Sequence, residues 1–173
     1  MIEQKAKNIK LLIMDVDGVL TDGRIVYTDG GDQLKFFSVL DGMGLALLSK
    51  SGIKSAILTA KKSRIVTERA KDMHIDRVYQ DAVNKLKVFK EVLSDFKVKS
   101  DEVCFIGDDV LDIPVLRKVG LAVSVPNAVS EVKNEVHYIT IKHGGKGAVR
   151  EVIDMILKHQ GKMDSVIKKF YED

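Results

Sequence analysis

The chain has 173 residues, of which 45% are hydrophobic and 31% are charged, and this is the length and composition of one soluble globular domain. These values exclude general disorder, a collagen-like fibre and a disulfide scaffold, and a net charge of +3 without any basic run gives little support for nucleic-acid binding. There is no signal-peptide pattern and no apolar run of 18 residues, and the single Cys104 cannot form an internal disulfide. We therefore expect a cytoplasmic protein with no membrane and no nucleic acid among its partners.

Short apolar runs alternate with longer amphipathic stretches along the chain. The runs expected to form strands are residues 11–14, 55–58, 103–106 and 121–123, with another strand near Val78 and Tyr79. The stretches with helical spacing are residues 41–51, 63–73, 84–96, 109–119 and 146–160. Uniformly apolar strands separated by helices are typical of a parallel sheet that is covered on both faces. The pattern predicts an α/β fold with a doubly wound, mostly parallel, Rossmann-like sheet.

Residues 24–38 break this alternation. Two short apolar segments flank Gly30 and Gly31, which predicts a β-hairpin directly after the first strand and its turn. A hairpin at this place can act as a flap over a site at the sheet edge. No linker divides the chain, so we expect a single domain over residues 1–173, with the flap at about 24–38, a C-terminal tail at about 161–173 and no large cap domain.

Polar residues gather at the carboxyl ends of the expected strands, where open parallel sheets bind their ligands. Asp15 and Asp17 follow the first strand, and the next residue, Gly18, permits a tight turn. The other polar residues at or near strand ends are Thr59, Lys61, Lys85, Asp108, Asp109 and Asp112. The occurrence of all these groups at the strand ends of one chain is the main indication of its function.

Such a set suits phosphoryl transfer. A carboxylate can attack phosphorus and form an acyl phosphate, while a second carboxylate protonates the leaving alkoxide and later activates water. A hard cation such as Mg²⁺ is needed to bring two anions together, and a lysine with a hydroxyl can hold the phosphoryl oxygens.

Each group taken alone has a plainer explanation. Asp-Gly is often only a turn, Thr59 could cap a helix, Lys85 could be a solvated helix residue, and Asp108 with Asp109 could cap the following helix. Their joint occurrence, in order and beside strand ends, favours a catalytic site containing Asp15, Asp17 and Asp108, together with Thr59 and Lys85. The roles of Asp22, Asp109 and Asp112 stay open.

The sequence resembles the haloacid-dehalogenase-like phosphatases in four motifs and, within them, the 3-deoxy-octulosonate 8-phosphate (Kdo 8-phosphate) phosphatases. The motifs are Asp15-Val16-Asp17-Gly18-Val19, Thr59, Lys85 and Gly107-Asp108-Asp109. The narrower resemblance includes the segment Gly144-Gly145-Lys146-Gly147-Ala148-Val149-Arg150-Glu151 and extends over residues 9–162.

The resemblance implies a role for each matching residue. Asp15 is expected to be the nucleophile and a Mg²⁺ ligand, Asp17 the general acid and base that also binds the metal through its backbone carbonyl, and Asp108 the remaining metal carboxylate. Thr59 and Lys85 are expected to hold the transferring phosphoryl group. The expected substrate contacts are Asp17, Ser38, Val39, Leu40, Asp41, Gly42, Lys61, Arg69 and Lys85. The family also implies a homotetramer in which the hairpin, and often the tail, of one subunit covers a neighbour's site.

This chain departs from the family pattern at three places. Lys61 replaces the usual arginine and loses its planar fork, Ala46 replaces a common basic residue, and residues 80–83 lack the usual glycine and small polar residues. The expected activity is a phosphatase for the eight-carbon phosphorylated sugar acid. A nine-carbon sugar-acid 9-phosphate or another sugar phosphate is an alternative substrate, and a phospho-receiver module or a catalytically idle assembly domain are alternative functions.

Overall fold

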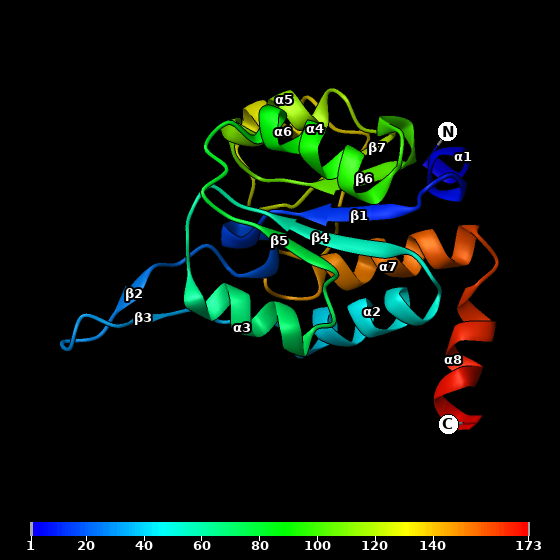
Figure 1. The fold of residues 1–173 in the computed structure, drawn as a ribbon, viewed down its shortest axis with the longest axis horizontal. Helices are drawn as coiled ribbons and strands as arrows, with labels where there is room; N and C mark the ends of the chain where they lie inside the picture. Colours follow the sequence, from blue (N-terminus) through cyan, green and yellow to red (C-terminus); the bar gives the residue numbers. More distant parts are fainter. Residues whose placement is uncertain (1, 173) are drawn as a thin grey trace.

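The computed structural model describes residues 2–172, and its centre is a parallel sheet of six strands in the order β5-β4-β1-β6-β7-β8 (Figure 1). The strands are β1 (Leu11–Met14), β4 (Lys54–Leu58), β5 (Arg77–Tyr79), β6 (Val103–Ile106), β7 (Leu121–Ser124) and β8 (Tyr138–Ile139). A separate antiparallel pair is formed by β2 (Val26–Tyr27) and β3 (Gln33–Leu34). The predicted α/β fold with a small hairpin is confirmed.

Helices cover both faces of the sheet. They are α1 (Ile2–Lys7), α2 (Val39–Lys50), α3 (Arg64–Asp72), α4 (Lys85–Phe96), α5 (Ile113–Leu116), α6 (Ser130–Lys133), α7 (Ala148–His159) and α8 (Met163–Glu172). One face carries α4, α5 and α6, and the opposite face carries α2, α3 and α7, as expected for a doubly wound sheet (Figure 1). Within residues 2–172, no helix has the length and apolar character needed to cross a membrane.

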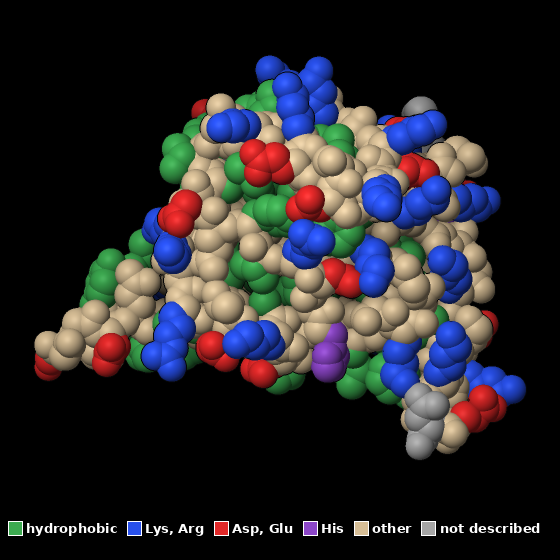
Figure 2. Space-filling view, viewed as in Figure 1, with side chains coloured by type: hydrophobic (Ala, Val, Ile, Leu, Met, Phe, Trp, Pro, Cys, Tyr) green, Lys and Arg blue, Asp and Glu red, His purple; other side chains and the backbone are tan. Residues whose placement is uncertain are grey.

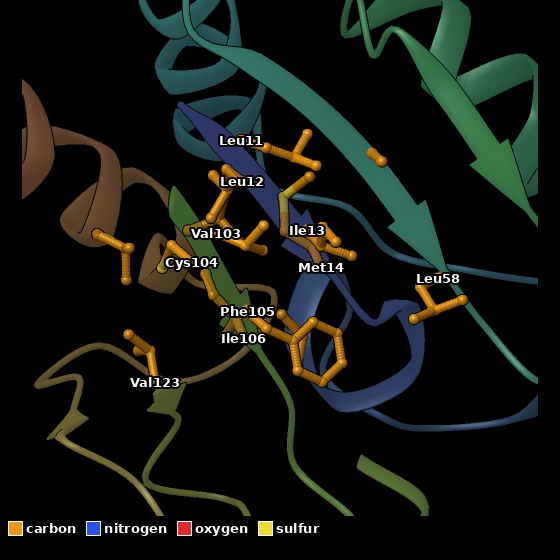
Figure 3. Packing of buried hydrophobic residues seen from close by; sticks show 14 of the residues in the cluster. Leu11, Leu12, Ile13, Met14, Leu58, Val103, Cys104, Phe105, Ile106 and Val123 are labelled. Atoms are coloured by element: carbon orange, nitrogen blue, oxygen red, sulfur yellow. The ribbon is translucent and has the colours of Figure 1, made fainter. Parts of the chain in front are cut away.

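The core is built from aliphatic side chains of the central strands, with Phe105 among them (Figure 3). All four residues of β1 are buried because helices cover the sheet on both sides. The register pairs Met14 with Ile57 on β4 and with Ile106 on β6. The residues that follow these three positions therefore leave the sheet at the same edge.

The hairpin stands out from the body of the molecule, at the left of Figure 1. Its turn closes through a hydrogen bond from the Thr28 backbone N–H to the Asp32 carbonyl at 2.9 Å, and Gly31 takes a positive φ of 86° that suits glycine. Several apolar side chains on it are exposed, and they are visible in the space-filling view (Figure 2). The predicted small hairpin is present within the expected residues 24–38.

The helix predicted over residues 109–119 is wrong in extent. The chain instead makes a 3₁₀ turn at Val110–Asp112 and then the short α5. Pro114 has no N–H to donate, and the Asp112 side chain accepts from the Asp108 and Asp109 backbones, which favours a tight turn over a regular helix.

Four short or terminal elements were not predicted: α1, α6, β8 and α8. Of these, α8 lies within the expected C-terminal tail and packs on α2 and α7 with Val166 buried. Lys50 lies 4.7 Å from the centre of the Phe170 ring, and Lys169 Nζ donates to the Lys50 carbonyl at 3.4 Å. The tail is therefore an amphipathic helix on its own subunit.

Candidate active site

The ends of β1, β4 and β6, together with the start of α4, bring the predicted chemical groups into one cavity of about 170 Å³. Its lining residues are Asp15, Asp17, Thr59, Ala60, Lys61, Lys85, Asp108, Asp109, Leu111 and Asp112. Every residue expected to act in catalysis or to bind metal through its side chain is therefore at this cavity. The parallel register explains why, since it places the strand ends next to one another.

A tight turn after β1 shapes the part of the cavity that holds Asp15. The Asp15 carboxylate accepts a hydrogen bond from the Val16 N–H at 2.7 Å, and a single wide turn over Val16–Leu20 closes with a 3.1 Å bond from the Thr21 N–H to the Val16 carbonyl. Gly18 has a φ of 90°, and a Cβ there would lie 2.0 Å from Asp108 Oδ2. Glycine is required at this position for both reasons.

Lys85 lies between two carboxylates. Its Nζ is 2.9 Å from Asp15 Oδ2 and 2.6 Å from Asp112 Oδ1, and its side chain is 2% exposed. Burial opposes the charged ammonium, but the two carboxylates outweigh it and raise the pKa of Lys85. The lysine is therefore held as a fixed cation beside Asp15.

Asp112 is buried, and its interactions are with protein groups. One oxygen accepts from Lys85, and the other accepts from the backbone N–H groups of Asp108 and Asp109 at 2.9 and 3.2 Å. It therefore positions Lys85 and the loop that carries Asp108. Asp109 caps the 3₁₀ turn through the Val110 N–H at 2.7 Å.

Asp22, whose role the sequence left open, pairs with exposed Arg24 outside the cavity lining.

Asp108 has an oxygen available for a ligand. Its Oδ1 is buried and has no hydrogen-bond partner among residues 2–172. Burial, followed by the nearby carboxylates of Asp15 and Asp112, raises the pKa of Asp108 to about 7, and burial raises that of Asp15 to about 6 despite Lys85.

One oxygen from each of Asp15, Asp108 and Asp112 lies within 4.8 Å of the others. Both oxygens of Asp112 are engaged, and Asp15 contacts Val16 through Oδ1 and Lys85 through Oδ2, so the buried oxygen of this cluster without a partner among residues 2–172 is Asp108 Oδ1. Carboxylate oxygens of this kind fit a hard divalent cation.

The turn bearing Asp17 is supported from the far end of the chain, which the sequence did not predict. Asn127, in the loop after β7, donates to the Gly18 carbonyl at 2.8 Å and accepts from the Gly144 N–H at 2.8 Å. A Cβ on Gly144 would lie 1.7 Å from the Gly18 oxygen, so only glycine fits. In the sequence, the Gly144-Gly145 pair indicates a tight backbone approach, but it does not show that the partner is a turn more than 120 residues earlier in the chain.

The expected substrate contacts fall into two groups. Asp17, Lys61 and Lys85 line the cavity, whereas the residues at the start of α2 and Arg69 are not among its lining residues. Arg69 donates to the Ser38 carbonyl at 3.4 Å and lies 5.8 Å from the centre of the Phe37 ring. The residues expected at the start of α2 are Ser38, Val39, Leu40, Asp41 and Gly42.

Among these residues, Asp41 has a structural role, because its carboxylate is buried against α7. It is buried, and its Oδ1 accepts from the Arg150 N–H at 2.8 Å, in the first turn of α7. Burial raises the pKa of Asp41 even though backbone N–H groups of α7 stabilise its charge. The carboxylate therefore joins α2 to α7.

Lys35, on the returning arm of the hairpin, was missed by the sequence analysis. Its ammonium forms an ion pair with the Asp17 carboxylate, and the lysine side chain is 7% exposed. A lysine between Leu34 and Phe36 in a hairpin gives no sign of such a contact, because the direction of the flap is set by tertiary structure.

Comparison with known proteins gives a consistent result. Residues 41–153 match the haloacid dehalogenase-like hydrolase family. The chain is 44% identical over 160 residues to the 3-deoxy-D-manno-octulosonate 8-phosphate phosphatase of Escherichia coli K12, which covers 92% of this chain and 85% of the relative.

Two solved structures are also similar. The phosphatase of that name from Moraxella catarrhalis, in complex with magnesium, phosphate and KDO, has a TM-score of 0.94 at 43% identity, covering 98% of this chain and 97% of the other. The one from Yersinia pestis has a TM-score of 0.92 at 42% identity, covering 94% and 88%. The chain belongs to the haloacid dehalogenase-like hydrolases and, within them, to the 3-deoxy-D-manno-octulosonate 8-phosphate phosphatase family.

Proposed function

We propose that this protein is a Mg²⁺-dependent phosphomonoester hydrolase that releases phosphate from 3-deoxy-D-manno-octulosonate 8-phosphate. The observation that carries the proposal is the cavity in which Lys85 bridges Asp15 and Asp112 while a buried Asp108 oxygen stays free. The similarity to phosphatases of this substrate over 92% of the chain gives the substrate class.

Asp15 and Asp108 would hold the cation through their carboxylates, and Asp17 would add its backbone carbonyl. A bound Mg²⁺ supplies positive charge that lets an anionic nucleophile approach an anionic phosphate. The free Asp108 oxygen supports this assignment, and so does the burial that raises the pKa of Asp108 and, despite the neighbouring Lys85, that of Asp15.

The protein residues have defined tasks in the reaction. An Asp15 oxygen attacks phosphorus and the bond from phosphorus to the sugar oxygen breaks, leaving an aspartyl phosphate and an alkoxide that takes a proton from Asp17. Water then attacks the same phosphorus, Asp17 takes the water's proton, and Asp15 is released with free phosphate. Lys85 and Thr59 hold the phosphoryl oxygens while negative charge builds on them.

We further propose a cytoplasmic homotetramer in which a neighbour covers the cavity. The support is the projecting hairpin, because its exposed apolar side chains offer a surface that a neighbouring subunit would cover. They are Ile25, Tyr27, Leu34 and Phe36. Size-exclusion chromatography with light scattering measures the assembly, and a monomeric active enzyme would contradict it.

A nine-carbon sugar-acid 9-phosphate is a second candidate substrate. Lys61 lines the cavity where relatives are expected to present an arginine, and Ala46 offers no charge at another expected basic position. Lysine keeps a positive charge but cannot grip a carboxylate through a planar fork. This difference affects the part of the substrate beyond the phosphate.

The test is phosphate release from both sugar-acid phosphates and from simple sugar phosphates, with Mg²⁺ and with chelator, using Asp15→Asn as the blank. We expect metal-dependent turnover that is fastest with the eight-carbon compound and absent in the blank. A preference for the nine-carbon compound would keep the chemistry and change the substrate. No turnover by folded wild-type protein in Mg²⁺ would contradict hydrolysis altogether.

A further inference from the structure

The ion pair between Lys35 and Asp17 joins the hairpin to the residue proposed as acid and base. Lys35 follows β3 directly, and the two residues after it are also anchored on their own subunit. Phe36 lies against Arg24, with 5.7 Å from the guanidinium carbon to the ring centre, and Phe37 forms an isolated antiparallel bridge with Thr21. The base of the hairpin is thus fixed against the turn that carries Asp17.

Burial makes this pair different from a surface salt bridge. The Lys35 side chain is 7% exposed and that of Asp17 is 24% exposed, whereas Arg24, on the other arm, is 70% exposed where it pairs with Asp22. Exposed pairs contribute little, but a buried ammonium needs a partner because it has lost its water. The cost of burying Lys35 is therefore compensated mainly where its nitrogen meets Asp17.

We propose that Lys35 is a positioning residue that holds the Asp17 side chain in the orientation needed for proton transfer to the leaving alkoxide. This inference rests on the proposed function and extends it to a residue of the flap. Asp15 and Lys85 are held by separate contacts, with Val16 and Asp112, so they do not depend on Lys35. Loss of Lys35 should impair the step that uses Asp17 and spare the attack on phosphorus.

Two substrates with different leaving groups separate these effects. A sugar phosphate leaves as an alkoxide that needs a proton, whereas p-nitrophenyl phosphate leaves as a stable phenolate that does not. The quantity to measure is kcat/KM, because it ends at the first irreversible step and excludes the later hydrolysis of the aspartyl phosphate. We expect Lys35→Met to lower kcat/KM for Kdo 8-phosphate about tenfold or more and to change that for p-nitrophenyl phosphate less than about threefold.

Three further variants sharpen the test. Lys35→Arg keeps a donor cation and should restore most of the activity on the sugar phosphate. Lys54→Met removes an exposed cation that pairs with Asp76 outside the cavity lining, and it should leave both rates near those of the wild type. In an Asp17→Asn background, adding Lys35→Met should not lower kcat/KM further, since the residue through which Lys35 acts has already lost its carboxyl group.

Equal losses on both substrates, or a further loss in the Asp17→Asn background, would show that Lys35 acts otherwise than by positioning Asp17 and would overturn the inference. Full activity of Lys35→Met would do the same. Melting curves of all variants identify a loss that comes from unfolding, and Lys35→Arg then decides the question. Wild-type protein that hydrolyses neither substrate would contradict the proposed function itself, and the role of Lys35 with it.

Discussion

The carboxyl edge of the sheet and the hairpin region differ in how far contacts within one subunit fix their side chains. At the sheet edge, Asp112 is fully buried with both oxygens engaged, and Lys85 has carboxylates on two sides. Around the hairpin and the start of α2, Tyr27 is 64% exposed and Val39 is 80% exposed. One region is closed by its own contacts, and the other presents apolar surface to solvent.

This difference separates chemistry from specificity. The groups proposed to break the phosphate ester are oriented by hydrogen bonds within the subunit, so they are formed before substrate arrives. The segment expected to meet the sugar, at the start of α2, is not part of the cavity lining, and its apolar side chains Val39 and Leu40 are exposed. We therefore expect substitutions at the sheet edge to affect every substrate alike, and substitutions near the flap to discriminate among substrates.

Figure 2 extends the comparison to the surface. On the face shown, basic side chains are interspersed with acidic ones and do not form one continuous patch. Mixed charges of this kind are typical of a solvated surface, and the similar numbers of basic and acidic residues, 28 and 25, agree with it. The charges that matter for the proposed reaction are instead inside the cavity.

The largest expected effect comes from disrupting the buried hydrogen bonds of Asp112 at the sheet edge. Asp112→Asn places an amide N–H₂ where either Lys85 or the N–H groups of Asp108 and Asp109 need an acceptor. We expect kcat to fall about 100-fold for all phosphate esters, with purified variants assayed under saturating Mg²⁺.

Asp95→Asn is a matched control, because Asp95 also pairs with a cation, Arg77 at 3.1 Å, but on the exposed surface. It should keep full activity and change the free energy of unfolding by at most about 1 kcal/mol. Equal activity of the two variants would show that burial at the sheet edge has no special role.

A second prediction compares glycines from the two regions. A methyl group on Gly144 would collide with the Gly18 carbonyl, whereas one on Gly30, in the hairpin turn, meets only the Thr28 hydroxyl at 3.7 Å. We expect Gly144→Ala to lower the free energy of unfolding by about 2 kcal/mol and Gly30→Ala to leave it nearly unchanged. Urea titrations followed by circular dichroism measure both, and a neutral Gly144→Ala would mean that the turn bearing Asp17 can move freely.

A third prediction concerns pH and metal. Burial raises the pKa of Asp108 to about 7 and that of Asp15 to about 6, so without metal the native protein retains protons that the unfolded chain releases near pH 4. Between about pH 4 and pH 7 these groups therefore make the metal-free protein less stable as the pH rises. Metal requires the deprotonated forms, so the affinity for Mg²⁺ should rise by about tenfold per pH unit between about pH 6 and pH 7, where Asp108 titrates, and more steeply below about pH 6, where Asp15 is protonated as well.

The measurement is the difference in melting temperature between samples with Mg²⁺ and with chelator, taken from pH 5 to pH 8. The difference should grow with pH and level off above about pH 7. Asp108→Asn should remove most of it. A difference that does not depend on pH would contradict the assignment of Asp108 as a ligand.

The sequence predicted the residues that meet at the sheet edge and the presence of the hairpin, but it did not predict the long-range contacts that hold them, for physical reasons. Asp15 and Asp108 follow short, uniformly apolar runs that are typical of buried strands, and neighbouring parallel strands end at one edge, so their meeting follows from local pattern and topology. The contacts of Lys35 and Asn127 depend on how distant segments fold back, which no local periodicity records. The regular helix expected over residues 109–119 does not form because the Asp112 side chain accepts from the backbone N–H groups of Asp108 and Asp109 and fixes a tight turn there.

The smallest expected effect tests the specificity side of the comparison at Lys61. This residue lines the cavity from the exposed loop after β4, close to the proposed phosphate site, and has no buried polar partner among residues 2–172. Lys61→Arg adds the planar fork that binds carboxylate or phosphate through two parallel hydrogen bonds. If the loop serves the sugar acid, KM for Kdo 8-phosphate should fall about threefold, while kcat and the rate with p-nitrophenyl phosphate stay unchanged.

The control is Lys62→Arg, at the exposed neighbouring position outside the cavity lining, which should change the kinetics with neither substrate. A fall in KM that also appears with p-nitrophenyl phosphate would instead place Lys61 at the phosphate, and the boundary between the chemical and specificity regions would then lie beyond this loop.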